Sequence, residues 1–204
     1  GDSDKQASTS PFAKVYDELW VAGQAGADRF RRAAVGARED QFVYVGRPTL
    51  DSIAQQENSQ MGDSGGPGPA SEAGNTKTIL YAPTWEGSDR EQEYSSVHQG
   101  GYKMIDNLLA MDPPVRIVYK SHPKAGQRLA TMSAAHKRIV ERLQQANAKI
   151  ADPARQHVLA DKGQQSLYYW FDQADFLVTD VSSVLSDFIV TEKPYAVFNF
   201  TDKD

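Results

Sequence analysis

Short apolar runs alternate with amphipathic segments along the second half of the chain. The runs predict strands at residues 78–82, 115–120, 157–159, 176–179 and 196–200. Helical spacing between them predicts helices at residues 101–111, 133–147, 166–171 and 184–191. Because helices alternate with strands, the connections are crossovers, which build a parallel sheet with helices on both faces. The pattern therefore predicts an α/β fold with a parallel, Rossmann-like sheet.

The first fifty residues show the same pattern on a smaller scale. Apolar runs at 19–22 and 42–45 predict strands, and residues 25–34 between them predict a helix. Residues 61–75 are rich in Gly, Ser and Pro, and such a segment buries too little apolar surface to be ordered alone. We therefore expect a flexible linker or loop over residues 54–75, which is also the best candidate for a domain boundary.

Composition narrows the classes of partner. The formal net charge is −5, whereas an extended nucleic-acid surface requires clustered Lys and Arg. We therefore expect no nucleic-acid partner, although a local phosphate site remains compatible with this charge. The chain has no cysteine, which excludes disulfides and thiolate metal sites. No apolar run approaches the ~20 residues of a membrane span.

Ligands of open parallel sheets bind at the carboxyl ends of the strands, so the residues after each strand are the candidates for chemistry. Polar and turn-forming residues gather there, at 83–86, 121–123, 180–183 and 201–202. The sequence contains no nucleophile elbow, no Walker-type phosphate loop and no H-E-x-x-H zinc motif. The chemistry must therefore be sought in these strand-end segments individually.

Residues 180–187 follow an apolar strand and open a helix. Ser182 or Ser183 would lie at the helix N-cap, where free backbone N–H groups and the helix dipole favour an anion such as a diphosphate. Asp187 lies one turn into the helix and could accept hydrogen bonds from ribose hydroxyls. The alternative is an ordinary serine N-cap with Asp187 simply favourable in the first turn, and this segment alone favours that alternative.

Two further strand ends carry candidate groups. His122, followed by Pro123, could contact a donor phosphate or act as an acid or base, or it could be a loop histidine bound to a carbonyl. Thr84 could bind phosphate, and Trp85 could stack on a base or wall the pocket, although core packing is the commoner fate of a Trp. The other histidines are weaker candidates: His136 is expected to be solvated, His157 structural, and His98 undecided.

Taken together, these segments resemble the CDP-glycerol glycerophosphotransferase family. The motifs that carry the resemblance occur in the family's order: Gly1-Asp2-Ser3-Asp4-Lys5, Ala82-Pro83-Thr84-Trp85, His122-Pro123, residues 179–188, and Lys193-Pro194. They cover most of the chain outside residues 57–75. The resemblance implies a glycosyltransferase-B-like architecture, with residues 1–53 as part of the acceptor-side domain and crossover, and residues 76–204 as the nucleotide-donor domain, truncated at its C-terminus.

The resemblance also implies a function. Family members move a glycerophosphate-type unit from a CDP-alcohol donor to a hydroxyl of a growing teichoic-acid-like polymer, or to a lipid-linked acceptor. Carried over by motif, Ser182 and Ser183 would hold the donor diphosphate, and Asp187 would hold the ribose. His122 would face the phosphates as the catalytic residue of this chain, with Thr84 and Trp85 beside them. No metal site and no cofactor are expected.

Two departures from the family pattern limit the expected activity. The family commonly has a histidine just before the Gly-Asp-Ser-Asp-Lys segment, and its catalytic base is expected on that missing side. The chain also stops at Asp204, where the family continues with further helices that brace the two domains. We therefore expect this chain alone to have little activity. The resemblance implies a cytoplasmic enzyme, peripheral at the inner face of the plasma membrane, with membrane contact only through parts absent from this chain.

Two other interpretations of the function remain open. One is a nucleotide-sugar glycosyltransferase or epimerase of the same fold, which would prefer uridine or guanosine over cytidine. The other is a non-catalytic module that binds a nucleotide or a partner.

Overall fold

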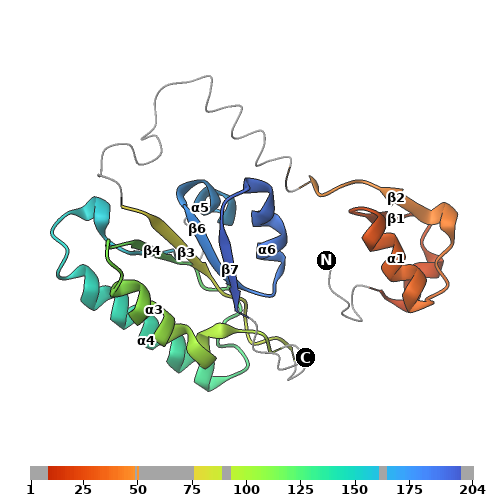
Figure 1. Cartoon of the computed structure of the whole chain (residues 1–204). Helices are drawn as coiled ribbons and strands as arrows, with labels where there is room; N and C mark the ends of the chain where they lie inside the picture. The colour runs from red at the N-terminus through yellow and green to blue at the C-terminus, as the bar shows by residue number, and fades with distance from the viewer. Residues whose placement is uncertain (1–8, 49, 51–75, 89–92, 161–164, 199–204) are drawn as a thin grey trace. The chain divides into compact units, whose positions relative to one another are not determined.

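The computed structural model describes residues 9–48, 50, 76–88, 93–160 and 165–198, and the chain divides into two compact units (Figure 1). The first unit is residues 1–65 and the second is residues 66–204. The linker expected over residues 54–75, the Gly1–Lys5 motif and the strand-end residues 201–202 lie outside the described residues. Each unit is considered by itself.

The first unit contains a strand–helix–strand motif. Its elements confirm the three predicted from the apolar pattern: β1 (Leu19–Val21), α1 (Gln24–Ala33) and β2 (Phe42–Tyr44), with a 3₁₀ helix (Pro11–Val15) before β1 and another (Glu39–Gln41) before β2. β1 and β2 pair in parallel, with Leu19 opposite Phe42. Because parallel strands need a crossover, α1 makes the connection between them.

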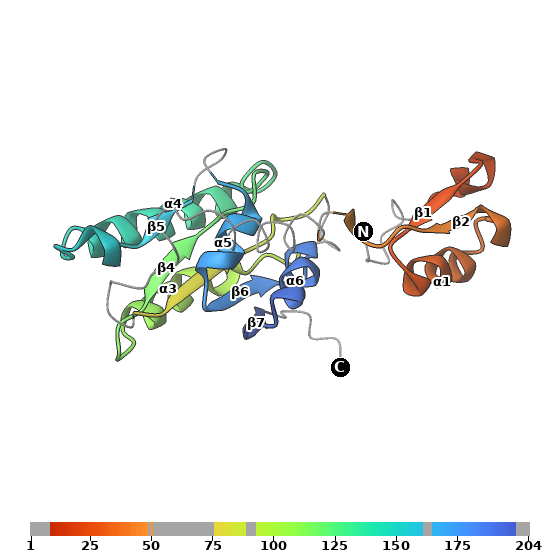
Figure 2. The same cartoon turned by 90° about the horizontal axis from the view of Figure 1, so that it is seen from above.

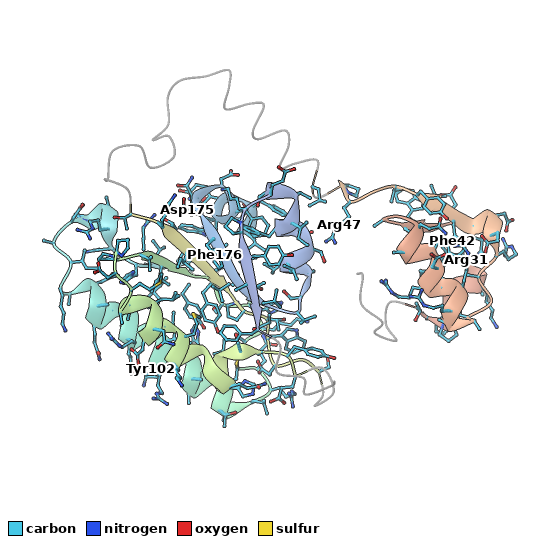
Figure 3. The ribbon with its side chains drawn as sticks, viewed as in Figure 1. Arg31, Phe42, Arg47, Tyr102, Asp175 and Phe176 are labelled. Carbon is cyan, nitrogen blue, oxygen red and sulfur yellow. The ribbon has the colours of Figure 1, made fainter. Side chains whose placement is uncertain are left out.

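Buried Gln41 holds the loops of the first unit together. Its side-chain amide donates to the carbonyls of Ala13 and Tyr16, and its Oε1 accepts the backbone N–H of Arg38 at 2.7 Å. A buried amide of this kind is stable only because its polar atoms are paired. On α1, the guanidinium of Arg31 lies over the ring of Phe42, 5.2 Å from its centroid (Figure 3).

The second unit is built on a five-stranded parallel sheet in the order β5-β4-β3-β6-β7. Its strands are β3 (Thr78–Ala82), β4 (Arg116–Tyr119), β5 (Val158–Leu159), β6 (Phe176–Asp180) and β7 (Tyr195–Phe198). Its helices are α3 (Tyr102–Leu109), α4 (Ala130–Asn147), α5 (Leu167–Gln173) and α6 (Ser183–Phe188), with a π-helix (Val97–Gly101) before α3 and 3₁₀ helices at Pro153–Arg155 and Ile189–Thr191. The α/β class with a parallel sheet is therefore confirmed.

Helices cover both faces of this sheet, α3 and α4 on one side and α5 and α6 on the other (Figures 1 and 2). All five residues of β3 are buried, as expected of a central strand. Alternate residues of β3 therefore enter two cores. Ile79 and Tyr81 pack in the cluster that includes Ile105 of α3 and Ile139 of α4.

The boundaries of several elements differ from those predicted. The helix expected at 101–111 starts as a π-helix at Val97 and continues as α3, and α4 begins at Ala130 rather than at 133. The helix expected at 184–191 is α only to Phe188 and then tightens to a 3₁₀ turn. The last strand starts one residue early, at Tyr195, and its predicted end at 199–200 lies outside the described residues.

The π-helix depends on the missing side chain of Gly101. A Cβ at that position would lie 2.7 Å from the Tyr81 hydroxyl and 3.2 Å from Ile139 Cδ1. The Tyr81 hydroxyl is itself 2.7 Å from Ser96 Oγ in a buried hydrogen bond. The close approach of Gly101 therefore lets the π-helix lie directly on the central strand.

We expect Gly101→Ala to lower the free energy of unfolding of the second unit by about 1–3 kcal/mol, because the added methyl group overpacks a filled site. Gln99→Ala is the control, since Gln99 is exposed on the same π-helix and its truncation should cost less than about 0.5 kcal/mol. Urea unfolding of both variants measures the difference. Equal losses of unfolding free energy in the two variants would show that the close approach of Gly101 to Tyr81 does not limit packing at this site.

Candidate functional site

Three of the segments singled out in the sequence lie at one edge of the sheet. β4, β3 and β6 are neighbours and run parallel, so the loops that follow them leave from the same edge. These loops carry His122, Thr84 and the pair Ser182-Ser183. The topology therefore gathers the candidates at the carboxyl edge, where open parallel sheets bind ligands.

Trp85 and His122 are in direct contact across two of these loops. Their rings stack with centroids 6.0 Å apart and an interplanar angle of 18°. The ammonium of Lys124 lies 5.2 Å from the centre of the Trp85 ring. Trp85 is half-buried rather than buried in the core. The cluster of Trp85, His122 and Lys124 thus forms an aromatic and basic wall at the sheet edge.

The imidazole of His122 is oriented by its own loop. Its Nδ1 accepts the backbone N–H of Lys124 at 3.1 Å, so in the neutral ring the proton is on Nε2. Fixing the tautomer in this way makes Nε2–H a hydrogen-bond donor, which suits a phosphate oxygen. This hydrogen bond therefore ties one ring nitrogen of His122 to the backbone of its own loop.

Ser182 and Ser183 open α6, as the sequence predicted. Ser182 is the N-cap residue, in extended conformation (φ −153°, ψ 171°), but its side chain caps no N–H of the helix. Its buried Oγ has no hydrogen-bond partner among the described residues. Ser183 is the first helical residue and is exposed. Ser182 therefore does not behave as an ordinary N-cap, in contrast to Ser166, whose Oγ accepts the N–H of Tyr169.

Asp187 lies one turn into α6 and is 8% exposed. Tyr168 of α5 approaches it, with the phenol oxygen 3.5 Å from Asp187 Oδ2. Sequence reasoning missed Tyr168, because nothing in the chain indicates that α5 and α6 lie side by side on the same face of the sheet. The Asp187 carboxylate of α6 thus lies beside the phenol of Tyr168 of α5.

Asp180, the last residue of β6, opens one of the segments singled out in the sequence, but the sequence predicted no role of its own for it. It is completely buried, and its two oxygens accept the backbone N–H groups of Thr84 at 2.8 Å and of Ser96 at 3.1 Å. Burial raises the pKa of Asp180 to about 6, against the opposing effect of the hydrogen bonds from Ser96 and Thr84. The available signal was a carboxylate at the end of an apolar strand, which costs free energy unless it is paired.

A second buried carboxylate, Glu86, anchors the start of α4. It accepts the backbone N–H groups of Gly126 at 2.9 Å, Arg128 at 2.8 Å and Leu129 at 3.2 Å. Burial acts to raise the pKa of Glu86, but the hydrogen bonds from Arg128 and Gly126 outweigh it and hold the pKa below its ordinary value. These bonds satisfy N–H groups at the helix entrance and explain why α4 begins earlier than predicted.

The other histidines have structural partners. Arg128 extends the Glu86 network to Glu93 at 2.8 Å, and Glu93 binds His98 Nε2 at 2.8 Å. His157 is buried and its Nδ1 accepts the N–H of Ile117, so the structural interpretation is confirmed. The expectation that His136 is solvated is wrong, because it is half-buried and hydrogen-bonded to the Tyr119 hydroxyl at 2.9 Å.

Neither a metal cluster nor a membrane-spanning helix is found within the described ranges. Among those residues, no group of three or more His, Cys, Asp or Glu side chains is placed to hold a metal ion. In the same part of the chain, no helix is both long enough and apolar enough to cross a bilayer.

We expect Glu86→Gln to lower the free energy of unfolding at pH 7 by about 1–3 kcal/mol, because one acceptor of buried N–H groups is replaced by a donor. Since the folded-state pKa of Glu86 is lowered, its charge stabilises the fold above the ordinary pKa of 4.5, and this contribution is lost as the pH falls through the lowered pKa. The difference between wild type and variant should therefore shrink in acid.

Glu141→Gln is the control, because Glu141 is an exposed carboxylate on the same helix. It should have little effect at either pH. Denaturant unfolding at pH 7 and pH 4 gives both values, and a Glu86 effect that stays constant or grows in acid would contradict this role of the carboxylate.

Comparison with known proteins places this geometry in context. The chain resembles the structure of the wall teichoic acid polymerase TagF with a TM-score of 0.54 and 20% identity, over 92% of this chain and 41% of TagF. For a histidine-to-asparagine variant of TagF soaked with CDPG, the TM-score is 0.52 and the sequence identity is 17%. This match covers 94% of this chain and 40% of that one. For an α,α-trehalose-phosphate synthase from Burkholderia vietnamiensis, the TM-score is only 0.45 and the sequence identity 12%, over 92% of this chain and 45% of the synthase. This likeness is too weak to support an argument.

The likeness to TagF confirms the glycosyltransferase-B-like α/β fold class. The chain spans about 41% of the length of TagF. No curated protein matches the chain in sequence. The family model described as CDP-Glycerol:Poly(glycerophosphate) glycerophosphotransferase matches residues 3–204, nearly the whole chain. The chain therefore belongs to the CDP-glycerol:poly(glycerophosphate) glycerophosphotransferase family.

Proposed function

We propose that the second unit binds a CDP-alcohol donor and that the whole enzyme transfers the polyol phosphate to a hydroxyl of a teichoic-acid-like polymer. The observation that carries the proposal is the convergence of three family motifs at the carboxyl ends of β4, β3 and β6. Residues 1–53 would then belong to the acceptor-side domain and crossover. The acceptor itself is a polymer or a lipid-linked precursor.

The site offers suitable groups for a nucleoside diphosphate. Ser182 has a buried hydroxyl with no hydrogen-bond partner among the described residues, and Ser183 adds an exposed hydroxyl beside it. Nε2–H of neutral His122 is a further donor, and Lys124 brings a positive charge to the Trp85 ring. Hydroxyl, imidazole and ammonium donors together match the acceptor oxygens of a diphosphate. Asp187 would accept hydrogen bonds from the ribose hydroxyls.

The reaction is a direct displacement at phosphorus. The acceptor oxygen attacks the β-phosphorus of the donor, a new P–O bond forms, the bond to the bridging oxygen breaks, and CMP leaves. The proton of the acceptor hydroxyl passes to a base from the remainder of the enzyme. The part of His122, Ser182 and Ser183 is to stabilise the negative charge that develops on the leaving phosphate.

The cellular setting follows from the same proposal. The enzyme would use its cytidine-activated donor in the cytoplasm, and a lipid-linked acceptor would bring it to the inner face of the membrane. Contact with the bilayer would come from segments outside this chain. Nucleic acid is not proposed as a partner, because the chain carries a formal net charge of −5.

Calorimetric titration of this chain with CDP-glycerol, against CMP, UDP and GDP, tests the proposal. We expect selective binding of the cytidine nucleotides. Ser183→Ala and Asp187→Asn should each weaken CDP-glycerol binding by roughly tenfold, the effect of losing one hydrogen bond to a charged or polar ligand group.

Ser166→Ala is the matched control, since Ser166 caps α5 through a bond already made within the protein. It should lower stability without changing affinity. Preference for UDP or GDP would reassign the chain to a nucleotide-sugar enzyme of the same fold. Failure of a folded chain to bind any nucleotide contradicts the donor-site proposal.

A further inference from the structure

Asp180 joins the segments that carry the candidate donor groups. We propose that Asp180 is a positioning residue of the donor site, whose carboxylate fixes the Ser182-Ser183 loop against the loop that follows β3. This inference rests on the proposed function, because it assigns Asp180 a task in donor binding. The residue touches no substrate and acts through the groups that it holds in place.

The geometry concentrates three chain segments on one side chain. Asp180 ends β6, while Thr84 lies in the loop after β3 and Ser96 is the N-cap residue of the π-helix. The Asp180 oxygens accept one backbone N–H from each, at 2.8 Å from Thr84 and 3.1 Å from Ser96. The side chain is fully buried, so water does not compete for these bonds.

Asp180 is close enough in the chain to the Ser182-Ser183 loop to determine where that loop lies. Only Val181 separates it from Ser182, and β6 is hydrogen-bonded to β3 up to the pair Thr179 and Ala82. Beyond that pair, the bond from Thr84 to Asp180 continues the link between the two strands into their loops. The relative placement of Thr84 and Ser182 therefore depends on the Asp180 carboxylate.

The chemistry requires an ionised carboxylate at this position. Here Oδ2 accepts the N–H of Thr84 and Oδ1 accepts the N–H of Ser96, whereas an asparagine would turn an NH₂ group toward one of these two N–H donors. Protonation of Asp180 has a similar effect, because the added O–H competes with one of the two N–H groups for its oxygen. A neutral side chain at position 180 thus loosens one of the two loops.

The surroundings of Asp180 make its positioning role depend on pH. Burial raises its pKa to about 6, the hydrogen bonds from Ser96 and Thr84 act in the opposite direction, and His98 of the π-helix lowers the pKa when charged. Tyr81 of β3 and Tyr119 of β4 are the other titratable groups nearby, and both stay neutral because burial raises their pKa values. Protonation of Asp180 therefore occurs just below neutral pH.

Stability and donor affinity should respond to this titration in opposite directions. Because the folded-state pKa lies above the ordinary value of 3.8, the contribution of Asp180 to folding stability is full below 3.8 and is lost as the pH rises through about 6. Donor affinity should instead fall as the pH drops through the same range, since protonation releases one loop. A purely structural role predicts no such divergence.

Asp175 provides a matched control at the other end of the same strand. It lies at the start of β6, next to Phe176 and at the opposite edge of the sheet (Figure 3). Its carboxylate also accepts a β3-side backbone N–H, from Thr78 at 2.8 Å, and it pairs with Lys77 at 2.8 Å. Asp175→Asn therefore removes a similar interaction far from the candidate site.

The test compares CDP-glycerol affinity from pH 5 to pH 8 for wild type, Asp180→Asn and Asp175→Asn. We expect Asp180→Asn to bind about tenfold more weakly than wild type at pH 8, with a ratio that shrinks toward one at pH 5. Asp175→Asn should bind like wild type throughout. Taking the ratio to wild type cancels the pH effects that all three proteins share.

Amide hydrogen exchange supplies a second measurement that needs no variant and no ligand. In the wild-type chain, the protection of the Thr84 or the Ser96 amide should fall as the pH drops through about 6, after correction for intrinsic exchange. If Asp180→Asn does not fold, this measurement alone decides whether the carboxylate ties the loops together.

The possible failures are distinguishable. If wild type binds CDP-glycerol and Asp180→Asn binds equally well, or if their ratio is independent of pH, the positioning role is overturned and the proposed function stands. Unchanged amide protection across the titration overturns it as well. If wild type binds no cytidine nucleotide, the proposed function fails and the positioning role falls with it.

Discussion

The parallel pairing of β3 with both β4 and β6 is the constraint on which the rest of the second unit depends. β3 is buried along its whole length, and its two neighbours align with it residue by residue from Ile79 to Tyr81. Because all three strands run in the same direction, their following loops must meet at one edge. The family motifs, separated by up to about a hundred residues in sequence, become neighbours for this reason alone.

The sheet brings the loops together, but backbone pairing ends with the strands. Beyond that point two buried carboxylates take over. Asp180 binds the N–H groups of the loop after β3 and of the π-helix, and Glu86 binds the N–H groups that lead into α4. Each carboxylate is buried at a cost that is offset only by its hydrogen bonds. Removal of either group therefore affects a whole loop rather than one contact.

Much of this fold could be predicted from hydrophobic periodicity. The strands of the sheet and the crossover helices follow from local patterns, since a buried parallel strand is apolar and an amphipathic helix repeats at 3.6 residues. The motif positions of Thr84, His122 and Ser183 could also be placed, because they follow recognisable strands. What these residues bind stays a prediction, and so do the domain assignments around residues 54–75.

Interactions between distant segments could not be predicted in this way. Glu86 meets Gly126 and Asp180 meets Thr84 only after the sheet has formed, and no local pattern marks either pair. For the same reason the early start of α4, the π-helix before α3 and the contact of His136 with Tyr119 were missed. A polar residue inside or directly after an apolar run was the one hint available, because such a residue needs a partner.

The central claim is that the carboxyl edge of β4, β3 and β6 holds the donor diphosphate. A crystal structure of this chain with CDP-glycerol tests it most directly. The account predicts the diphosphate within hydrogen-bonding distance of Ser182 or Ser183 and of His122, with the ribose beside Asp187. A nucleotide bound at another edge of the sheet, or bound here with its phosphates away from these side chains, would contradict it.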